Sequence, residues 1–327
     1  MKFRFIIVAV LGLALALYLV TYVGLGAVFS AAVAVGWGGF AVLCLYALAL
    51  FPLLAAAWYV LPPAPPLLPP APPRAGFAVF VWARMVRDAA TDVLPFSQLG
   101  GIALGARAAV LQGVSPPMAF GSMIVDVTTE MLAQILFVAL GVMTLSVHAP
   151  RSSAAGSLTT ISVIGLLLGA AACVVFLVLQ RHGHRLAERL AARLLPAAVA
   201  TTAAVGAELD AIYRSPARVA LSAALHLAAW LASAFGIWIA FRLIGARVDI
   251  ASVIAIESLI CAVRSAAVAV PHALGVQEAA YTVIAPLFGV GAEFGLAVSL
   301  LKRARDIAVG IPILLIWQAV EGRRAMA

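Results

Sequence analysis

Long continuous apolar runs dominate the chain, and six of them are long enough to cross a membrane. They cover residues 5–24, 37–61, 118–147, 158–180, 219–243 and 294–320. A transmembrane helix needs about 20 consecutive apolar residues, whereas a strand of a membrane barrel alternates apolar and polar positions. The pattern therefore predicts an all-α polytopic membrane protein with about six full transmembrane helices.

Two further apolar stretches, residues 77–112 and 251–287, are interrupted by a proline with glycines after it. The first contains Pro95, Gly100 and Gly101, and the second contains Pro271 and Gly275. Proline removes a backbone donor and disfavours helix for the residue before it. We expect each stretch to form a re-entrant hairpin of two short helices. Its hinge would be Pro95, Gly100 and Gly101 in the first stretch and Pro271 and Gly275 in the second.

The order of these elements repeats along the chain. Each half has two spans, a proline-broken hairpin and then an unusually long span. The first half crosses the membrane three times. Because three is an odd number, the second half must have the inverted orientation. We therefore predict one integral-membrane domain, residues 1–327, built from inverted-topology repeats at about 1–150 and 157–327. Many secondary transporters build their substrate site where such repeats place discontinuous helices at mid-membrane.

Composition narrows the class of protein and its partners. The chain is 65% hydrophobic and 10% charged, which excludes a soluble enzyme and a nucleic-acid-binding domain. The net charge of +8 follows from the excess of Lys and Arg that cytoplasmic loops carry. A cytoplasmic N-terminus places most loop bases, including the basic segment 181–218, on the cytoplasmic side. We expect a multi-pass protein of the bacterial inner (plasma) membrane with both termini in the cytoplasm.

Charged residues cluster on the two broken stretches and on the long spans that follow them. Each costs roughly 2.5–3.5 kcal/mol at a helix centre unless it is paired. A spacing of four predicts the pairs Arg84–Asp88 and Lys302–Asp306. We expect substrate contacts from Arg84, Arg87, Arg107, Arg264, Lys302, Arg303, Arg305, Gln98 and Gln277. A charge network or proton relay would be formed by Asp88, Asp92, Asp126, Glu130, Glu257, Glu278 and Asp306. The alternative is a satisfied ion-pair network that only locks the hairpins in place.

The sequence offers no pattern typical of a catalytic or metal centre. No Ser, Cys or Thr lies in a nucleophile elbow, and no glycine-rich phosphate loop is present. His226 and His272 have no second ligand at metal spacing, which favours packing or hydrogen bonding. We expect no enzyme activity, no cofactor and no metal.

A family resemblance appears in the two hairpins. The segment PHALGVQEAAY at residues 271–281 resembles the signature of the lysylphosphatidylglycerol synthase transmembrane-region family. The segments LPFSQLGG at 94–101, GAR at 105–107 and VDVTTE at 125–130 are most similar to its hopanoid-biosynthesis-associated subgroup. The resemblance covers nearly the whole chain and implies a lipid flippase or lipid-transfer role. It implies no synthase activity, which resides in a soluble domain that this sequence does not include.

The leading hypothesis is a lipid translocase that moves a polar-headed lipid, hopanoid-related or an anionic phospholipid, through a cavity between the hairpins. One alternative is an integral-membrane transferase acting on a lipid-linked substrate, with a buried carboxylate as base. Another is a non-catalytic accessory subunit that binds lipid-biosynthesis enzymes through its basic segment. Membrane lipids are the expected partners, and the sequence leaves the oligomeric state open.

Overall fold

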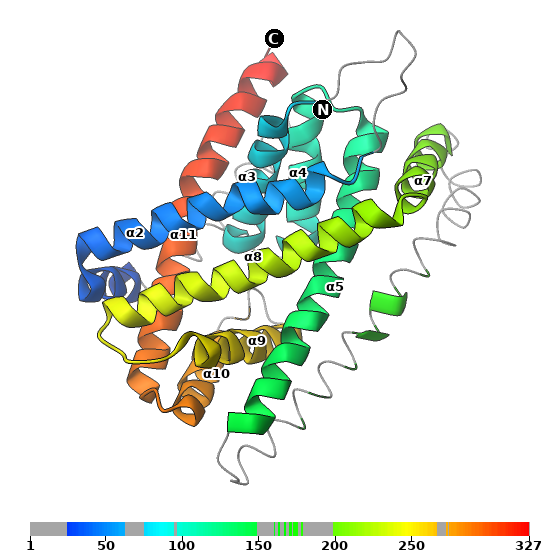
Figure 1. Cartoon of the computed structure of the whole chain (residues 1–327). Helices are drawn as coiled ribbons and strands as arrows, with labels where there is room; N and C mark the ends of the chain where they lie inside the picture. Colours follow the sequence, from blue (N-terminus) through cyan, green and yellow to red (C-terminus); the bar gives the residue numbers. More distant parts are fainter. Residues whose placement is uncertain are drawn as a thin grey trace.

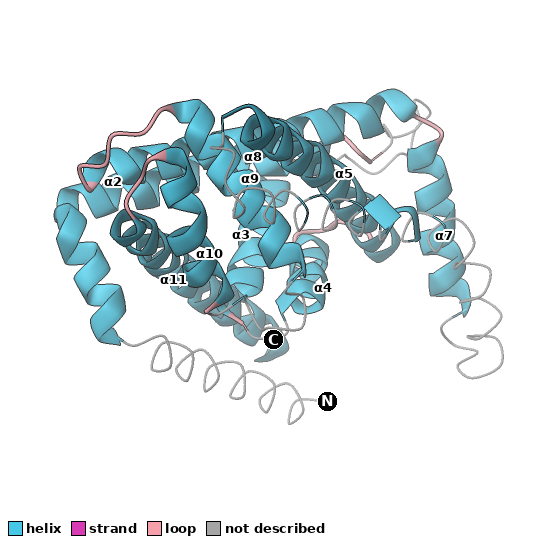
Figure 2. Cartoon of the chain, turned by 90° about the horizontal axis from the view of Figure 1, so that it is seen from below, coloured by secondary structure: helices cyan, strands magenta, loops and turns pink. Residues whose placement is uncertain are grey.

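The computed structural model describes residues 25–62, 75–94, 97–148, 199–266, 273 and 275–326, with scattered positions between 160 and 178. These residues form helices and connecting loops, with no strand among them (Figure 2). The predicted first span, residues 5–24, and most of the predicted span 158–180 lie outside the described residues. So do residues 181–198 of the basic segment 181–218.

Two helices of opposite direction, α2 (Leu25–Tyr59) and α8 (Pro216–Leu243), pack along each other (Figure 1). α2 bends at Gly36, whose φ of 75° suits a residue without a Cβ atom. Gly236 of α8 leaves room for the ring of Tyr46, because a methyl group at this position would lie 2.8 Å from that ring. The Tyr46 hydroxyl donates to the carbonyl oxygen of Ala232 at 2.7 Å. Close packing and one hydrogen bond therefore fix this crossing.

Each predicted broken stretch forms two helices, as its proline predicts. The first gives α3 (Phe77–Val93) and α4 (Ser97–Leu111), and Leu94 between them is extended, with φ −94° and ψ 137°. The second gives α9 (Ile250–Ala266), α10 (Val276–Ile284) and the 3-10 turn η3 (Ala285–Phe288). Pro95 and Pro271, predicted as hinges, lie outside the described residues.

The predicted hinge glycines occupy different places. Gly275 directly precedes α10 with a φ of 76°, at the bend where the sequence predicts it. Gly100 and Gly101 instead lie inside α4, so the first chain break comes before them. Gly101 serves helix packing, because a methyl group there would lie 2.7 Å from the carbonyl oxygen of Arg87 on α3.

The two longest helices after the breaks are α5 (Pro116–His148) and α11 (Ala292–Met326), and they run in opposite directions (Figure 1). α5 packs on α8 and α9, while α11 packs on α2 and α3. Each long helix thus contacts the first helix of the other broken stretch. A shorter helix, α7 (Val199–Tyr213), precedes α8 and packs on α5.

Three described helices are long and apolar enough to cross a membrane: Val35–Tyr59, Pro116–Thr144 and Pro216–Leu243. They confirm the predicted spans 37–61, 118–147 and 219–243. α11 has 35 residues and a length of about 50 Å, which also suffices for a crossing. Its middle carries Lys302, Arg303, Arg305 and Asp306, which interrupt its apolar run.

Candidate functional site

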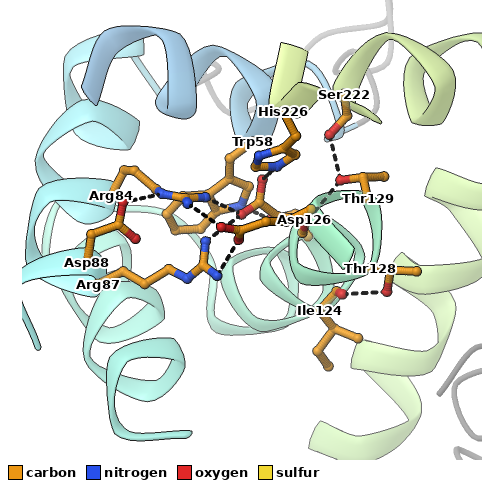
Figure 3. Close-up of polar contacts among 12 residues, drawn as sticks. Trp58, Arg84, Arg87, Asp88, Ile124, Asp126, Thr128, Thr129, Ser222 and His226 are labelled. Atoms are coloured by element: carbon orange, nitrogen blue, oxygen red, sulfur yellow. Dashed lines mark hydrogen bonds and ion pairs between the residues drawn. The ribbon is translucent and has the colours of Figure 1, made fainter. Parts of the chain in front are cut away.

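Ionisable side chains of α3, α5 and α8 meet inside the bundle and form what we call the first network (Figure 3). Arg84 on α3 is 1% exposed, and each of its three guanidinium nitrogens donates to a different carboxylate. The acceptors are Asp88 at 2.9 Å, Asp126 at 2.9 Å and Glu130 at 3.0 Å. Arg87 donates to Asp126 at 3.1 Å and to Glu130 at 2.6 Å. The two arginines therefore clamp α3 onto α5 through charge-assisted hydrogen bonds.

Local packing sets the position of Arg87. Helix α4 lies close to α3 because Gly101 and Gly105 face it. A methyl group at Gly105 would lie 2.7 Å from Cβ of Arg87 and 3.0 Å from Cε of Met123. The small residues of α4 therefore allow α4 to pack closely on α3 beside Arg87.

His226 joins the first network from α8. Its Nε2 lies 2.9 Å from Oδ1 of Asp126, while Oδ2 of the same carboxylate accepts from Arg84 and Arg87. The imidazole is 1% exposed, and its Nδ1 has no hydrogen-bond partner among the described residues. One turn earlier on α8, Ser222 shares a 2.8 Å hydrogen bond with Thr129 of α5. Asp126 is thus the point at which three helices meet.

The second network lies in the other half of the chain, between α9, α10 and α11. Nζ of Lys302 donates to Oε2 of Glu257 at 2.7 Å, and the Tyr281 hydroxyl donates to Oε1 of the same carboxylate. Arg303 donates to Glu278 at 2.6 Å, and Glu278 also accepts from the backbone amide of Gly275 at 2.8 Å. The Glu278 carboxylate therefore links the bend before α10 to α11, because it accepts from both Gly275 and Arg303.

The second network also includes Gln277, which is buried and donates to Oγ of Ser299 at 3.1 Å. Gln98, the other predicted amide contact, has a side chain outside the described residues.

Equivalent helix positions carry opposite charges in the two networks. Arg84 and Glu257 are each the eighth residue of their helix, counting from Phe77 in α3 and from Ile250 in α9. Asp126 and Lys302 are each the eleventh residue of the following long helix. In the Arg84–Asp126 pair the cation is therefore on the broken stretch, whereas in the Glu257–Lys302 pair it is on the long helix.

A third group of charges lies where α3 and α9 end beside α11. Arg305 donates to the neighbouring Asp306 at 2.6 Å. Asp92 experiences the charges of Arg264, Arg305 and Asp306 but makes no hydrogen bond or ion pair with another described residue. Arg264 likewise has no such partner within the described part of the chain. Asp92 and Arg264 therefore keep donors and acceptors that no other described residue uses.

Arg107 lies apart from all three groups. It projects from α4 with a side chain that is 46% exposed, and it donates to Glu321 near the end of α11 at 2.9 Å. Glu321 is buried, and its second carboxylate oxygen has no partner among the described residues. The pair therefore joins the first broken stretch to the last helix.

Metal binding can be weighed against this geometry. Ligand atoms of Asp126, Glu130 and His226 lie within 4.8 Å of one another, a spacing that a metal ion accepts. Both carboxylates, however, already accept hydrogen bonds from Arg84 and Arg87. An added cation would meet two guanidinium groups, so the geometry favours an ion-pair network over a metal centre.

Of the two ion pairs expected from helical spacing, one forms and the other does not. The Arg84–Asp88 pair is confirmed at 2.9 Å. The Lys302–Asp306 pair is wrong, because Lys302 binds Glu257 and Asp306 binds Arg305.

Three functional residues escape the sequence reasoning. Tyr281 and Glu321 are missed as partners, and His226 is considered only as an isolated histidine. Their partners lie 24, 214 and 100 positions away in sequence. The only signal for them is an ionisable or polar residue inside an apolar run.

Comparison with known families gives one match. The family model described as the lysylphosphatidylglycerol synthase TM region matches residues 5–313. Comparisons with curated proteins and with solved structures found no match. The match covers both networks, every described helix before α11 and the larger part of α11. The chain therefore belongs to the lysylphosphatidylglycerol synthase transmembrane-region family.

Proposed function

We propose that the chain is a lipid translocase, and not an enzyme, that moves a polar-headed lipid across the bacterial inner membrane. The headgroup would be that of an anionic phospholipid or a hopanoid-related lipid. The observation that carries the proposal is the concentration of buried ionisable groups on the two broken stretches and the long helices that follow. Ionisable residues at membrane depth are expensive and generally mark pathways for ions or substrates.

Two inverted-topology repeats fit the packing. If α2, α3, α4 and α5 correspond to α8, α9, α10 and α11, the main packing contacts of one half have counterparts in the other. The contact of α3 with α11 corresponds to that of α9 with α5, and the contact of α2 with α8 corresponds to itself. The opposite directions of α5 and α11 agree with such an inversion (Figure 1). The broken stretches would then be re-entrant hairpins that enter from opposite faces, with both termini in the cytoplasm.

The third group of charges is the best candidate for headgroup contact. Arg84 and Arg87 are committed to carboxylates, so binding a phosphate would require them to leave existing partners. Arg264 has no such commitment within the described residues, and Arg305 is bound only to its neighbour Asp306. A guanidinium with unused donors suits a phosphate oxygen. We assign the phosphate to Arg264 and Arg305, at the place where the first helix of each broken stretch, α3 and α9, ends.

A reconstitution assay tests the proposal. Full-length protein is placed in phosphatidylethanolamine vesicles that contain a trace of fluorescent phosphatidylglycerol, and crossing is read as the fraction that a membrane-impermeant quencher removes. We expect faster crossing than in protein-free vesicles. Arg264→Gln should slow it roughly tenfold, since one charge-assisted hydrogen bond is lost.

The matched control is Arg242→Gln. Arg242 is exposed at the end of α8 and lies over the Trp238 ring, away from both networks. Its variant should keep the wild-type rate. Crossing no faster than in empty vesicles would contradict the proposal, and equal slowing by both variants would refute the assignment to Arg264.

A further inference from the structure

Two polar atoms near the end of α11 are buried and have no hydrogen-bond partner among the described residues. One is the indole Nε1 of Trp317, which is a donor, and the other is Oε2 of Glu321, which is an acceptor. Trp317 is 9% exposed and Glu321 is 6% exposed. Buried polar atoms without a partner are unfavourable and rare, so two of them on one helix indicate a molecule that supplies the missing bonds.

The two side chains share one face of α11. They are four residues apart, the spacing at which side chains of a helix are neighbours. Long side chains in a helix lean toward its N-terminus, so that of Glu321 leans toward Trp317. Glu321 also faces α4, because its Oε1 accepts from Nε and Nη2 of Arg107. A donor and an acceptor on α11 are therefore placed beside a cation on α4.

The chemistry of the two unpartnered atoms selects their ligand. A hydroxyl group satisfies both, because its oxygen accepts from the indole N–H of Trp317 while its hydrogen is donated to the carboxylate of Glu321. An ammonium group has no acceptor to offer the indole, and a carbonyl or phosphate oxygen has no hydrogen to offer the carboxylate. The pair therefore fits a hydroxyl.

Arg107 adds a contact for a phosphate beside that hydroxyl. Its side chain is 46% exposed, and only its Nε and Nη2 donate to Glu321. Its Nη1 makes no hydrogen bond with another described residue. A guanidinium N–H suits a phosphate oxygen. The three side chains together fit a phosphate ester whose substituent carries a hydroxyl.

The position of these residues along α11 indicates where that ligand comes from. The apolar run of α11 ends at about residue 320, so Trp317 and Glu321 lie on either side of its end. Tryptophan is enriched at the level of the lipid headgroups, where the apolar part of a span meets water. A hydroxylated phosphate ester at that level is the headgroup of a phospholipid.

We propose that Arg107, Trp317 and Glu321 form a binding site for the headgroup of phosphatidylglycerol at the membrane surface. The phosphate binds Arg107, and a glycerol hydroxyl lies between Nε1 of Trp317 and Oε2 of Glu321. The headgroup enters beside Arg107, the most exposed of the three side chains, whose movement opens the way to the buried atoms. This site is separate from Arg264 and Arg305, so the proposal goes beyond lipid translocation.

The test compares two short-chain lipids, dioctanoyl phosphatidylglycerol and dioctanoyl phosphatidylmethanol. Both carry a phosphodiester, but only the first has headgroup hydroxyls. Their affinities for the full-length protein in a nonionic detergent are measured by isothermal titration calorimetry. We expect the wild type to prefer phosphatidylglycerol about tenfold, the contribution of roughly one charge-assisted hydrogen bond.

Trp317→Phe keeps an aromatic ring at this position and removes the N–H group. The preference for phosphatidylglycerol should fall about threefold, because the hydroxyl loses one of its two partners. The matched control is Trp238→Phe, since Nε1 of Trp238 already donates to the carbonyl oxygen of Val248 at 3.0 Å. That variant should keep the wild-type preference.

Arg107→Lys tests the phosphate contact separately. Lysine keeps a positive charge beside Glu321 but lacks the planar group that presents Nη1. Binding of both lipids should therefore weaken to a similar degree, with the preference between them unchanged. Unaltered binding of both lipids would refute the phosphate contact.

Two outcomes would overturn the hydroxyl contact. Equal binding of the two lipids by the wild type would show that the buried atoms bind water only. A preference that is lost in Arg264→Gln and kept in Trp317→Phe would place the selective contact at the residues proposed for translocation. None of these measurements involves lipid crossing, so failure here is distinguishable from failure of the proposed translocation.

Discussion

The first and second networks both join the first helix of a broken stretch to a long helix, yet their ions differ in the number of partners. Arg84 binds three carboxylates, whereas Lys302 binds one carboxylate and contacts the Tyr281 ring and hydroxyl. In the first network several ions share partners, so removing one leaves several groups unpaired. In the second, each cation depends mainly on a single acid. Equivalent positions can therefore contribute very differently to stability.

The largest difference should appear when the cation of the first network is removed. Arg84→Met leaves three carboxylates facing Arg87 alone, and breaking a buried ion pair on one side costs about 3–5 kcal/mol. We expect the lowest unfolding temperature of all these variants, or no folded protein. Chemical denaturation in detergent gives the comparison with wild type. A loss below about 1 kcal/mol would contradict the central role assigned to Arg84.

The second network should tolerate removal of its whole pair. Lys302→Met alone leaves Glu257 with only the Tyr281 hydroxyl and should cost about 1.5–3 kcal/mol, the contribution of a charged hydrogen bond. Adding Glu257→Gln removes the unpaired charge and keeps an acceptor for Tyr281, so most of that loss should be regained.

The first network provides the control for this double change. Arg84→Met combined with Asp126→Asn still leaves Asp88 and Glu130 without Arg84, so little stability should return. Equal recovery in the two halves would show that the networks are equivalent after all.

Adjacent glycines in α4 test how closely the first network is packed. A methyl group at Gly101 would press on the carbonyl oxygen of Arg87, whereas one at Gly100 would meet nothing within 4 Å. Gly101→Ala should cost about 1–3 kcal/mol through overpacking. Gly100→Ala should be neutral or stabilise by about 0.5–1 kcal/mol, because alanine loses less entropy in a helix. Thermal unfolding of the two variants measures the contrast, and an equal effect at both positions would contradict this packing.

The smallest effect concerns the starts of the two equivalent helices. Asp249 precedes α9 and accepts from the amide of Ser252 at 2.9 Å, whereas Gly76 precedes α3 without a side-chain cap. Hydrogen bonds from Ser252 lower the pKa of Asp249, which lies in the loop before the helix. Its contribution is therefore present at neutral pH and is lost as pH falls below about 4.

Asp249→Ala should lower the free energy of unfolding by about 1 kcal/mol at neutral pH. In acid, where the wild type has also lost this contribution, the substitution should have no effect. Unfolding at the two pH values measures this. The matched change Gly76→Ala removes no side-chain cap, and a loss as large as that of Asp249→Ala would contradict the assigned difference.

Sequence alone predicts the helices well and their partners poorly. The bounds of α5 and α8 and both breaks follow from apolar run length and proline, which act within a few residues. The Arg84–Asp88 pair also lies within one turn. Helical spacing shows which residues share a face but not which helix that face meets. For this reason Lys302 could be assigned to Asp306, one turn away, although its partner Glu257 is 45 positions distant.

The hydrogen bond from Nη1 of Arg218 to the carbonyl oxygen of Pro62, at 2.8 Å, constrains the path of the whole chain. It joins the residue just beyond one apolar span to the first turn of another, so the end of α2 and the start of α8 are held together although 156 positions separate the two residues.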